Sequence, residues 1–300
     1  MRELGETIMT ISATMVKELR DKTGAGMMDA KKALVETNGD MARAMELLRQ
    51  KGIASADKKM VRIAAEGTIA SVIDGKKGAM IEVNCETDFV AKNEDFKEFA
   101  KCLAGAVLDM NPESPEAMLA STCPKCGKAI EEVVKEKIAK IGEKITIRRF
   151  VRYDADCCVN TYIHNGKIGV LLEAKCPQGC DETLTKDICL HIASNAPEYI
   201  TRDEIPSDVI EEEKRIEMGK EDLAKKPENI REKIVAGRID KLMAQRCLLD
   251  QPFVKDPSIT IKQLIEGKCE IVRFTRYVLG EGLEKRQDNF AEEVMSQIKG

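Results

Sequence analysis

The sequence contains no tryptophan, and aromatic residues make up only 4% of its 300 positions. Proteins that bind single-stranded nucleic acids stack bases on aromatic side chains, so this scarcity argues against that class. A formal net charge of −4 leaves no basic excess for holding phosphates. No apolar run reaches the length of a membrane span, and the first residues lack the apolar core of a signal peptide. We therefore expect a cytoplasmic protein that binds neither nucleic acid directly nor a membrane.

The signatures of common catalytic sites are also missing. The sequence has no P-loop, no Gly-x-Gly-x-x-Gly turn between a strand and a helix, and no Gly-x-Ser-x-Gly nucleophile motif. Its two histidines, His164 and His191, are not spaced as metal ligands. His164 precedes a hairpin turn and suits a surface or an interface, whereas His191 lies on a predicted helix over 184–194 and is expected to be half-buried. We predict a protein that is not an enzyme and needs no cofactor.

Eleven cysteines are present, and without an export signal we expect reduced thiols. The segment Cys123-Pro124-Lys125-Cys126-Gly127 resembles half of a zinc knuckle, but a structural zinc site needs four ligands. Neither Cys157-Cys158 nor Cys176 with Cys180 supplies the matching half at the usual spacing. We predict no bound metal. A zinc-dependent module, or an enzyme that uses a cysteine thiolate, stays open as the alternative.

The composition that remains is that of a globular chain, with 43% hydrophobic and 33% charged residues. Its length suits about two domains. Apolar residues at helical spacing and glycine turns predict a small three-helix bundle at the N-terminus, of a size that suits a docking module. We expect its helices from Ser12 to Gly24, from Met27 to Val35 and from Asp40 to a stop at Gly52, with a helical linker over 53–66.

Two pairs of motifs recur in the same order along the chain. The glycine-lysine segment at 75–83 resembles that at 166–174, and Arg149-Phe150-Val151-Arg152-Tyr153 resembles Arg273-Phe274-Thr275-Arg276-Tyr277. One such match arises easily by chance, but two in order indicate a duplication. We predict two copies of an α+β unit, each built of a hairpin, helices and a closing strand.

The second copy is longer than the first, and its surplus is expected between Pro206 and Pro252. Apolar residues recur there at sevenfold spacing on both sides of Pro227, at Val209, Ile216, Leu223, Val235, Leu242 and Leu249. This pattern predicts an antiparallel coiled-coil hairpin inserted at about 207–249, with two ordinary surface helices as the alternative. In the first copy, residues 111–129 are expected to form a loop. At the C-terminus, Phe290, Val294 and Ile298 predict a short amphipathic helix.

The segment from Asn84 to Lys92 comes after a predicted strand over 79–83 and precedes a predicted amphipathic helix over 95–103. It should therefore form a compact acidic loop that carries Asp88 and Phe89. A phenylalanine beside a carboxylate in a loop suits a partner's pocket. The residues alone, however, favour Phe89 as a cap on the local core.

Motifs along almost the whole chain resemble those of the bacterial elongation factor Ts family. They lie at 16–20, 23–29, 31–34, 82–91, 141–143, 251–254 and 280–282. The resemblance implies an α+β fold whose parts match the organisation predicted above. Those parts are an N-terminal extension over 1–11, a UBA-like three-helix docking module over 12–54, core copies over 55–153 and 154–280 with the coiled-coil insertion in the second, and a C-terminal helical module over 281–300.

The resemblance also implies a guanine nucleotide exchange factor for elongation factor Tu, acting in translation elongation. Such a protein binds its partner in the GDP-bound and nucleotide-free states, disturbs the magnesium and phosphate site, and promotes GDP release. The family's wedge motif corresponds to Thr87, Asp88, Phe89 and Val90, and further contacts correspond to Ile141, Gly142 and His164. A scaffold whose helical module binds a different partner, such as a ubiquitin-like domain, is the rival from another functional class.

Overall fold

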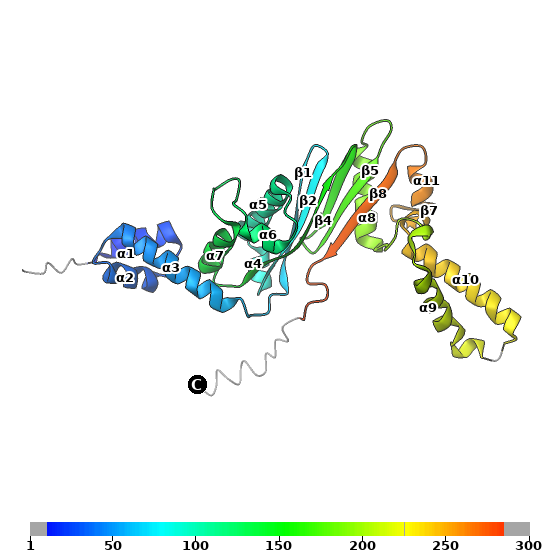
Figure 1. The fold of residues 1–300 in the computed structure, drawn as a ribbon, viewed down its shortest axis with the longest axis horizontal. Helices are drawn as coiled ribbons and strands as arrows, with labels where there is room; N and C mark the ends of the chain where they lie inside the picture. The colour runs from blue at the N-terminus through cyan, green and yellow to red at the C-terminus, as the bar shows by residue number, and fades with distance from the viewer. Residues whose placement is uncertain (1–10, 225, 285–300) are drawn as a thin grey trace, which may run out of the picture. The chain divides into compact units, whose positions relative to one another are not determined.

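The computed structural model describes residues 11–224 and 226–284, which combine helices with small sheets and confirm the α+β class (Figure 1). The predicted amphipathic helix with Phe290 and all but Ile11 of the predicted N-terminal extension lie outside the described residues. The chain divides into two compact units. Of the described residues, the first contains 11–68, 81–150 and 279–284, and the second contains 69–80, 151–224 and 226–278.

The described chain opens with three helices, α1 (Ala13–Thr23), α2 (Met27–Glu36) and α3 (Met41–Lys59). Ser12 caps α1 as predicted, because its side chain accepts a hydrogen bond from the Met15 amide. Gly24 ends α1 in the left-handed conformation, with φ at 69°. The helices share one apolar cluster, whose buried members are Val16, Leu19, Ala30, Ala33, Leu34 and Ala44.

The predicted stop at Gly52 is wrong, since α3 continues through it to Lys59. A Cβ atom on Gly52 would lie 2.8 Å from the Cβ of Ala139, which belongs to helix α7 (Ile130–Ile141). The glycine therefore permits two helices to approach closely and does not end one. Sequence alone shows a glycine but not the neighbour that requires it.

The first sheet has the order β1-β2-β3. Its strands and the helices between β2 and β3 are β1 (Glu66–Asp74), β2 (Lys77–Cys85), α4 (Asp88–Lys92), α5 (Glu94–Met110), α6 (Pro115–Ala120), α7 and β3 (Ile145–Asp154). The predicted loop over 111–129 is only partly right, because Ser114 caps the short helix α6 within it. The predicted loop after β2 is also corrected, since α4 occupies it.

The second sheet is antiparallel and has the equivalent order, β4-β5-β8. Its hairpin, the helix after the hairpin and the closing strand are β4 (Cys158–His164), β5 (Ile168–Lys175), α8 (Glu182–Asn195) and β8 (Glu270–Val278). In each sheet the glycine-lysine motif opens the second strand of the hairpin and the Arg-Phe-x-Arg-Tyr motif lies on the closing strand. This is the arrangement that the paired motifs predicted.

The insertion of the second copy contains α9 (Ser207–Met218) and α10 (Glu228–Arg246), which contact each other. The heptad prediction is wrong in detail. Ile216 is half-exposed, and Leu223 lies in a separate 3-10 turn, η2 (Glu221–Leu223). On α10 the buried positions have fourfold spacing, at Val235, Ile239 and Met243. Further elements of this unit are η1 (Arg202–Glu204), η3 (Leu248–Asp250), β6 (Pro252–Phe253), β7 (Asp256–Thr260) and α11 (Ile261–Ile265).

A buried carboxylate anchors the described end of the first unit. Glu82 on β2 is fully buried and accepts hydrogen bonds from Arg148 at 2.8 Å, Arg149 at 2.6 Å and the Gly280 amide at 2.9 Å. Burial alone would raise the pKa of Glu82, but the Gly280 amide and the two guanidinium groups outweigh it and lower the pKa. Glu82 therefore stays ionised inside the protein, because Arg148, Arg149 and the Gly280 amide donate hydrogen bonds to its carboxylate.

Two expectations about single residues need correction. Cys158 and Cys180 are joined by a disulfide bond, so not every thiol is free as predicted. His191 on α8 is fully buried, whereas half-burial was expected. Its Nε2 atom lies 2.8 Å from Oε1 of Gln251, and its Nδ1 atom accepts the Val254 amide at 3.1 Å. Of the helices in the described ranges, none is both long and apolar enough to cross a membrane.

Candidate functional site

The candidate site begins where β2 ends, at the buried Cys85. Burial raises the pKa of the Cys85 thiol to about 12, so the sulfur keeps its proton. The thiol donates a hydrogen bond to the carbonyl of Thr87 at 3.2 Å. The chain leaves the strand here through a bend at Glu86. The turn and the helix after it, residues 86–92, are called the Thr87 turn below.

Thr87 acts as the N-cap of α4, accepting a hydrogen bond from the Val90 amide at 3.4 Å. Asp88 occupies the first turn and Lys92 the last, which places each charge at the helix end that favours it. The two side chains form an ion pair at 2.6 Å. The hydrogen bond that Lys92 donates lowers the pKa of Asp88, so the Asp88 carboxylate stays ionised on the surface.

Phe89 points away from the protein, with 81% of its surface exposed. The expectation from the residues alone, that Phe89 caps the local core, is therefore wrong. Val90, the next residue, is only partly exposed. The structure thus presents one large apolar side chain beside one carboxylate at the tip of a capped helical turn.

Glu143 holds this turn in place. Its carboxylate accepts hydrogen bonds from the Glu86 amide at 3.1 Å, the Thr87 amide at 3.0 Å and the Thr87 hydroxyl at 2.6 Å. The carboxylate of Glu86 in turn accepts a hydrogen bond from the Lys144 amide at 2.6 Å and forms an ion pair with Arg62 at 3.3 Å. Two glutamates therefore fasten the segments 86–87 and 143–144 to each other.

The positions Ile141 and Gly142 lie immediately before this clamp. Ile141 is the last residue of α7, and Gly142 ends the helix with φ at 89° and donates its amide to Ile138 at 2.8 Å. A side chain at this φ is strained, which explains the glycine. The structure therefore brings two predicted contact residues to the base of the Thr87 turn.

His164 belongs to the other unit, at the exposed end of β4. Its Nδ1 atom lies 3.1 Å from the Tyr162 hydroxyl and its Nε2 atom 3.4 Å from the Asn165 amide nitrogen. It is a surface histidine with neutral hydrogen-bonding neighbours, as the sequence predicted.

The residue that sequence analysis missed is Glu143. It was noted only as the end of the Ile141-Gly142-Glu143 motif, because the sequence has 52 acidic residues and gives no sign of which one caps a distant turn. Its place directly after a helix-ending glycine was the available signal. A residue there leaves the helix with its side chain free to reach another segment.

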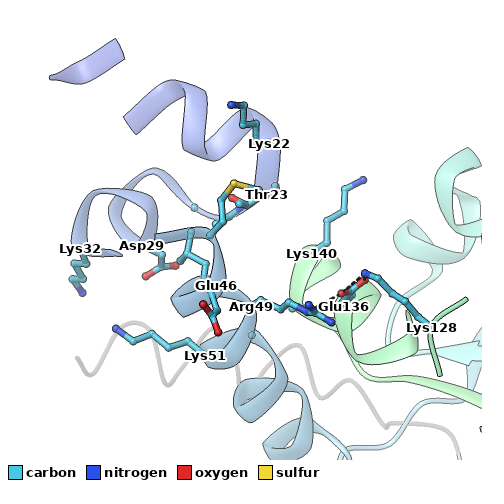
Figure 2. A pocket seen from close by; sticks show the side chains of 17 residues that line it. Lys22, Thr23, Asp29, Lys32, Glu46, Arg49, Lys51, Lys128, Glu136 and Lys140 are labelled. Atoms are coloured by element: carbon cyan, nitrogen blue, oxygen red, sulfur yellow. Dashed lines mark hydrogen bonds and ion pairs between the residues drawn. The ribbon is translucent and has the colours of Figure 1, made fainter. Parts of the chain in front are cut away.

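A cavity of about 1020 Å³ in the first unit is bordered by the α1–α2 turn, α3 and α7 (Figure 2). Part of its charged border is paired within the protein, because Glu136 pairs with Arg49 at 3.2 Å and with Lys128 at 2.7 Å. No cysteine or histidine lines this cavity. Within the described ranges, no group of three or more cysteine, histidine or acidic side chains is arranged to hold a metal ion. Neither the lining of this cavity nor the arrangement of possible metal ligands points to a catalytic centre in the part of the chain that the structure describes.

Comparison with known proteins supplies the context for this geometry. The family described as Elongation factor TS matches residues 86–281. Proteins named elongation factor Ts from Alkalilimnicola ehrlichii and Thioalkalivibrio sulfidiphilus are each 48% identical, over 296 and 297 residues, covering 97% of this chain and 100% of each relative. The one from Halorhodospira halophila is 45% identical over 294 residues, covering 97% of this chain and 99% of the relative.

Proposed function

The chain belongs to the elongation factor Ts family, and we propose that it is a guanine nucleotide exchange factor for elongation factor Tu. The observation that carries the proposal is the Thr87 turn, which exposes Phe89 on a support clamped by Glu143. An exposed aromatic ring on a rigid support suits insertion into a pocket of a partner.

In the proposed mechanism, Asp88 and Phe89 wedge into elongation factor Tu beside its magnesium and phosphate site. The carboxylate of Asp88 brings negative charge towards groups that hold Mg²⁺, and the ring of Phe89 displaces a neighbouring element of the partner. Mg²⁺ neutralises the diphosphate, so disturbing its site weakens the hold on GDP. Val90 and Thr87 keep the two side chains at the tip.

This action is a shift of population between states of the partner. A factor that binds nucleotide-free elongation factor Tu more tightly than the GDP-bound form loosens GDP by the same free energy. It therefore speeds release without changing the equilibrium between free nucleotides and needs no catalytic group of its own. We place this work in the cytoplasm, within translation elongation.

The other parts receive supporting roles in the proposal. The three helices over 12–54 are a UBA-like module that docks on the nucleotide-binding domain of elongation factor Tu, and Ile141, Gly142 and His164 add contacts from the two core copies. The pair α9–α10 takes the place of the family's coiled-coil hairpin. In this proposal the docking module ends at residue 54, the first core copy at residue 153 and the second at residue 280.

The test is release of a fluorescent GDP from purified elongation factor Tu, with excess unlabelled GDP added at the start. Micromolar amounts of the protein should raise the release rate well above that of the partner alone, in proportion to concentration until saturation. A pull-down run in parallel separates docking from exchange. Unchanged release by protein that binds elongation factor Tu would refute the exchange mechanism, and absence of binding would favour the rival scaffold.

A further inference from the structure

The hairpin that contains Cys123 and Cys126 is a built turn that the proposed function leaves unused. Its stem is closed by the Ile130 amide on the Ser121 carbonyl at 2.9 Å and the Cys123 amide on the Lys128 carbonyl at 2.7 Å. At the tip, the Gly127 amide donates to the Cys123 carbonyl at 2.9 Å, with Gly127 at φ 68°. These bonds hold the two cysteines in one fixed loop.

The two thiols of this hairpin share one turn and are accessible to solvent. Cys126 is exposed and Cys123 is half-exposed. They lie three residues apart in the single turn that the Gly127 amide closes on the Cys123 carbonyl. Burial alone would raise the pKa of Cys123, but hydrogen bonding from Cys126 and Lys125 and the positive charge of Lys125 outweigh it and hold the pKa below its ordinary value.

Other cysteines of the protein are in the opposite situation. Burial raises the pKa of the Cys85 and Cys247 thiols, and that of Cys269 to about 11. A thiol that keeps its proton is a poor nucleophile, so these residues are packing groups. Cys123 combines a lowered pKa, access to solvent and a second thiol three residues away in the same closed turn, which are marks of a redox-sensitive cysteine.

We propose that Cys123 and Cys126 form a redox-active dithiol that reacts with low-molecular-weight disulfides. The Cys123 thiolate attacks one sulfur of the small disulfide, which forms a mixed disulfide and releases one thiolate. Cys126 loses its proton and attacks the Cys123 sulfur, which forms the Cys123–Cys126 disulfide and releases the second thiolate. The protein loses two electrons and the small disulfide gains them. A dithiol reductant reverses both steps.

A zinc site is the competing use of the same pair. Two thiolates are half of a structural zinc site, and the described residues offer no group of three or more ligands arranged for a metal ion. The proposal therefore assigns the pair to thiol–disulfide exchange, and bound zinc is an outcome that the experiment must detect.

The experiment treats reduced full-length protein with glutathione disulfide, blocks remaining thiols and digests with trypsin. Cleavage after Lys125 places Cys123 and Cys126 on different peptides, which a disulfide between them keeps linked until reduction. Linked peptides should accumulate in the wild-type protein. In Cys126→Ser, the reaction should stop at the first step, with glutathione retained on Cys123.

Cys123→Ser and Cys102→Ser are the matched controls. Cys123→Ser removes the attacking thiolate and should slow modification of Cys126 by tenfold or more, whereas Cys102→Ser removes an exposed thiol on α5 and should leave the linkage unchanged. The proposal is overturned if Cys123 gains glutathione no faster than Cys102, or if no linked peptides form. It is equally overturned if the purified protein holds stoichiometric zinc whose removal is needed before either cysteine reacts.

Discussion

At the scale of single residues, the Thr87 turn combines an exposed apolar ring with an unusually well-held backbone. Leaving Phe89 in water forgoes about 1.5–3 kcal/mol that its burial would contribute. The capping of Thr87 and the three hydrogen bonds to Glu143 fix the backbone that carries the ring. A partner that buries Phe89 therefore gains the apolar contact with little ordering of the loop.

Phe89→Ala should separate exchange from folding. Because Phe89 packs on little of its own chain, the free energy of unfolding should change by less than about 0.5 kcal/mol. Loss of an interface anchor costs about 2–4 kcal/mol, so GDP release from elongation factor Tu should slow by about tenfold or more. Urea unfolding and fluorescent GDP release measure the two effects. Normal exchange by this variant would remove the wedge from the mechanism.

Glu143→Ala should act on exchange through the shape of the turn. It leaves two amides and the Thr87 hydroxyl without their acceptor, at a cost of about 1–3 kcal/mol in stability. The rate of GDP release at saturating factor should fall more than the affinity for elongation factor Tu, because the docking surfaces elsewhere are untouched.

A double-mutant cycle tests whether this effect passes through Thr87. Thr87→Val removes the hydroxyl that both donates to Glu143 and caps α4, so its effect on exchange should overlap in part with that of Glu143→Ala, with a coupling of about 0.5–3 kcal/mol. Glu143→Asp should recover part of the activity if its shorter carboxylate reaches one of the amides. Strictly additive effects of the two substitutions would contradict a positioning role for Glu143.

At the scale of elements, α3 and α7 approach closely at Gly52. Gly52→Ala should destabilise the protein by about 1–3 kcal/mol through overpacking against Ala139, although alanine favours a helix by about 1 kcal/mol. Gly105→Ala on α5 is the matched control, because a Cβ there meets nothing within 4 Å, and it should stabilise by up to about 1 kcal/mol. Denaturant unfolding measures both.

Adding Ala139→Gly to Gly52→Ala should restore much of the loss, since it removes the atom with which the new Cβ collides. Failure of this second substitution to recover stability would show that the close contact does not explain the glycine.

Sequence predicted elements well wherever the decisive interaction is local. The Ser12 cap, the hairpins with their closing strands and the helix over 184–194 depend on neighbouring residues and periodicity, and all were found. The end of α3 was misplaced because Gly52 suggested a helix stop, whereas it is required by the close approach of Ala139 in a distant helix. The heptad assignment failed because α9 ends at Met218, and Leu223 then packs from a separate turn.

At the scale of the whole molecule, the two sheets share an order but differ in the segment that leaves the second strand. After β2 the chain forms the Thr87 turn, whereas after β5 it continues through Cys176 and Cys180 to α8. The paired motifs predicted the common scaffold, and the family resemblance suggested the wedge role that we propose for the Thr87 turn. Neither showed that Glu82 is buried beside Arg148, Arg149 and Gly280, because those contacts join segments far apart in the sequence.

Stability should fall in acid in two stages that involve both units. His191 in the second unit is held neutral: burial lowers its pKa below the ordinary value near 6.5, outweighing the opposing hydrogen bond with Gln251. As the pH falls, His191 therefore binds a proton in the unfolded chain before it does so in the folded protein. The stability that neutral His191 contributes is present above about pH 6.5 and is lost as the pH falls below it. Glu82 in the first unit also has a lowered pKa. The stability that its ionised carboxylate contributes is therefore present above its pKa in the unfolded chain, near 4.5, and is lost as the pH falls below that value.

Urea unfolding between neutral pH and about pH 2.5 measures these stages through two single variants. His191→Gln removes the titrating ring, so the decline in unfolding free energy just below pH 6.5 should become shallower, whatever the variant's stability at neutral pH. Glu82→Gln should leave that first decline intact and flatten the one below pH 4.5. The quantity compared is the slope of the unfolding free energy against pH. Each substitution also loses packing or ion pairs, but that loss lowers the unfolding free energy at every pH and leaves the slope unchanged. An unchanged slope in His191→Gln would mean that another group causes the first stage.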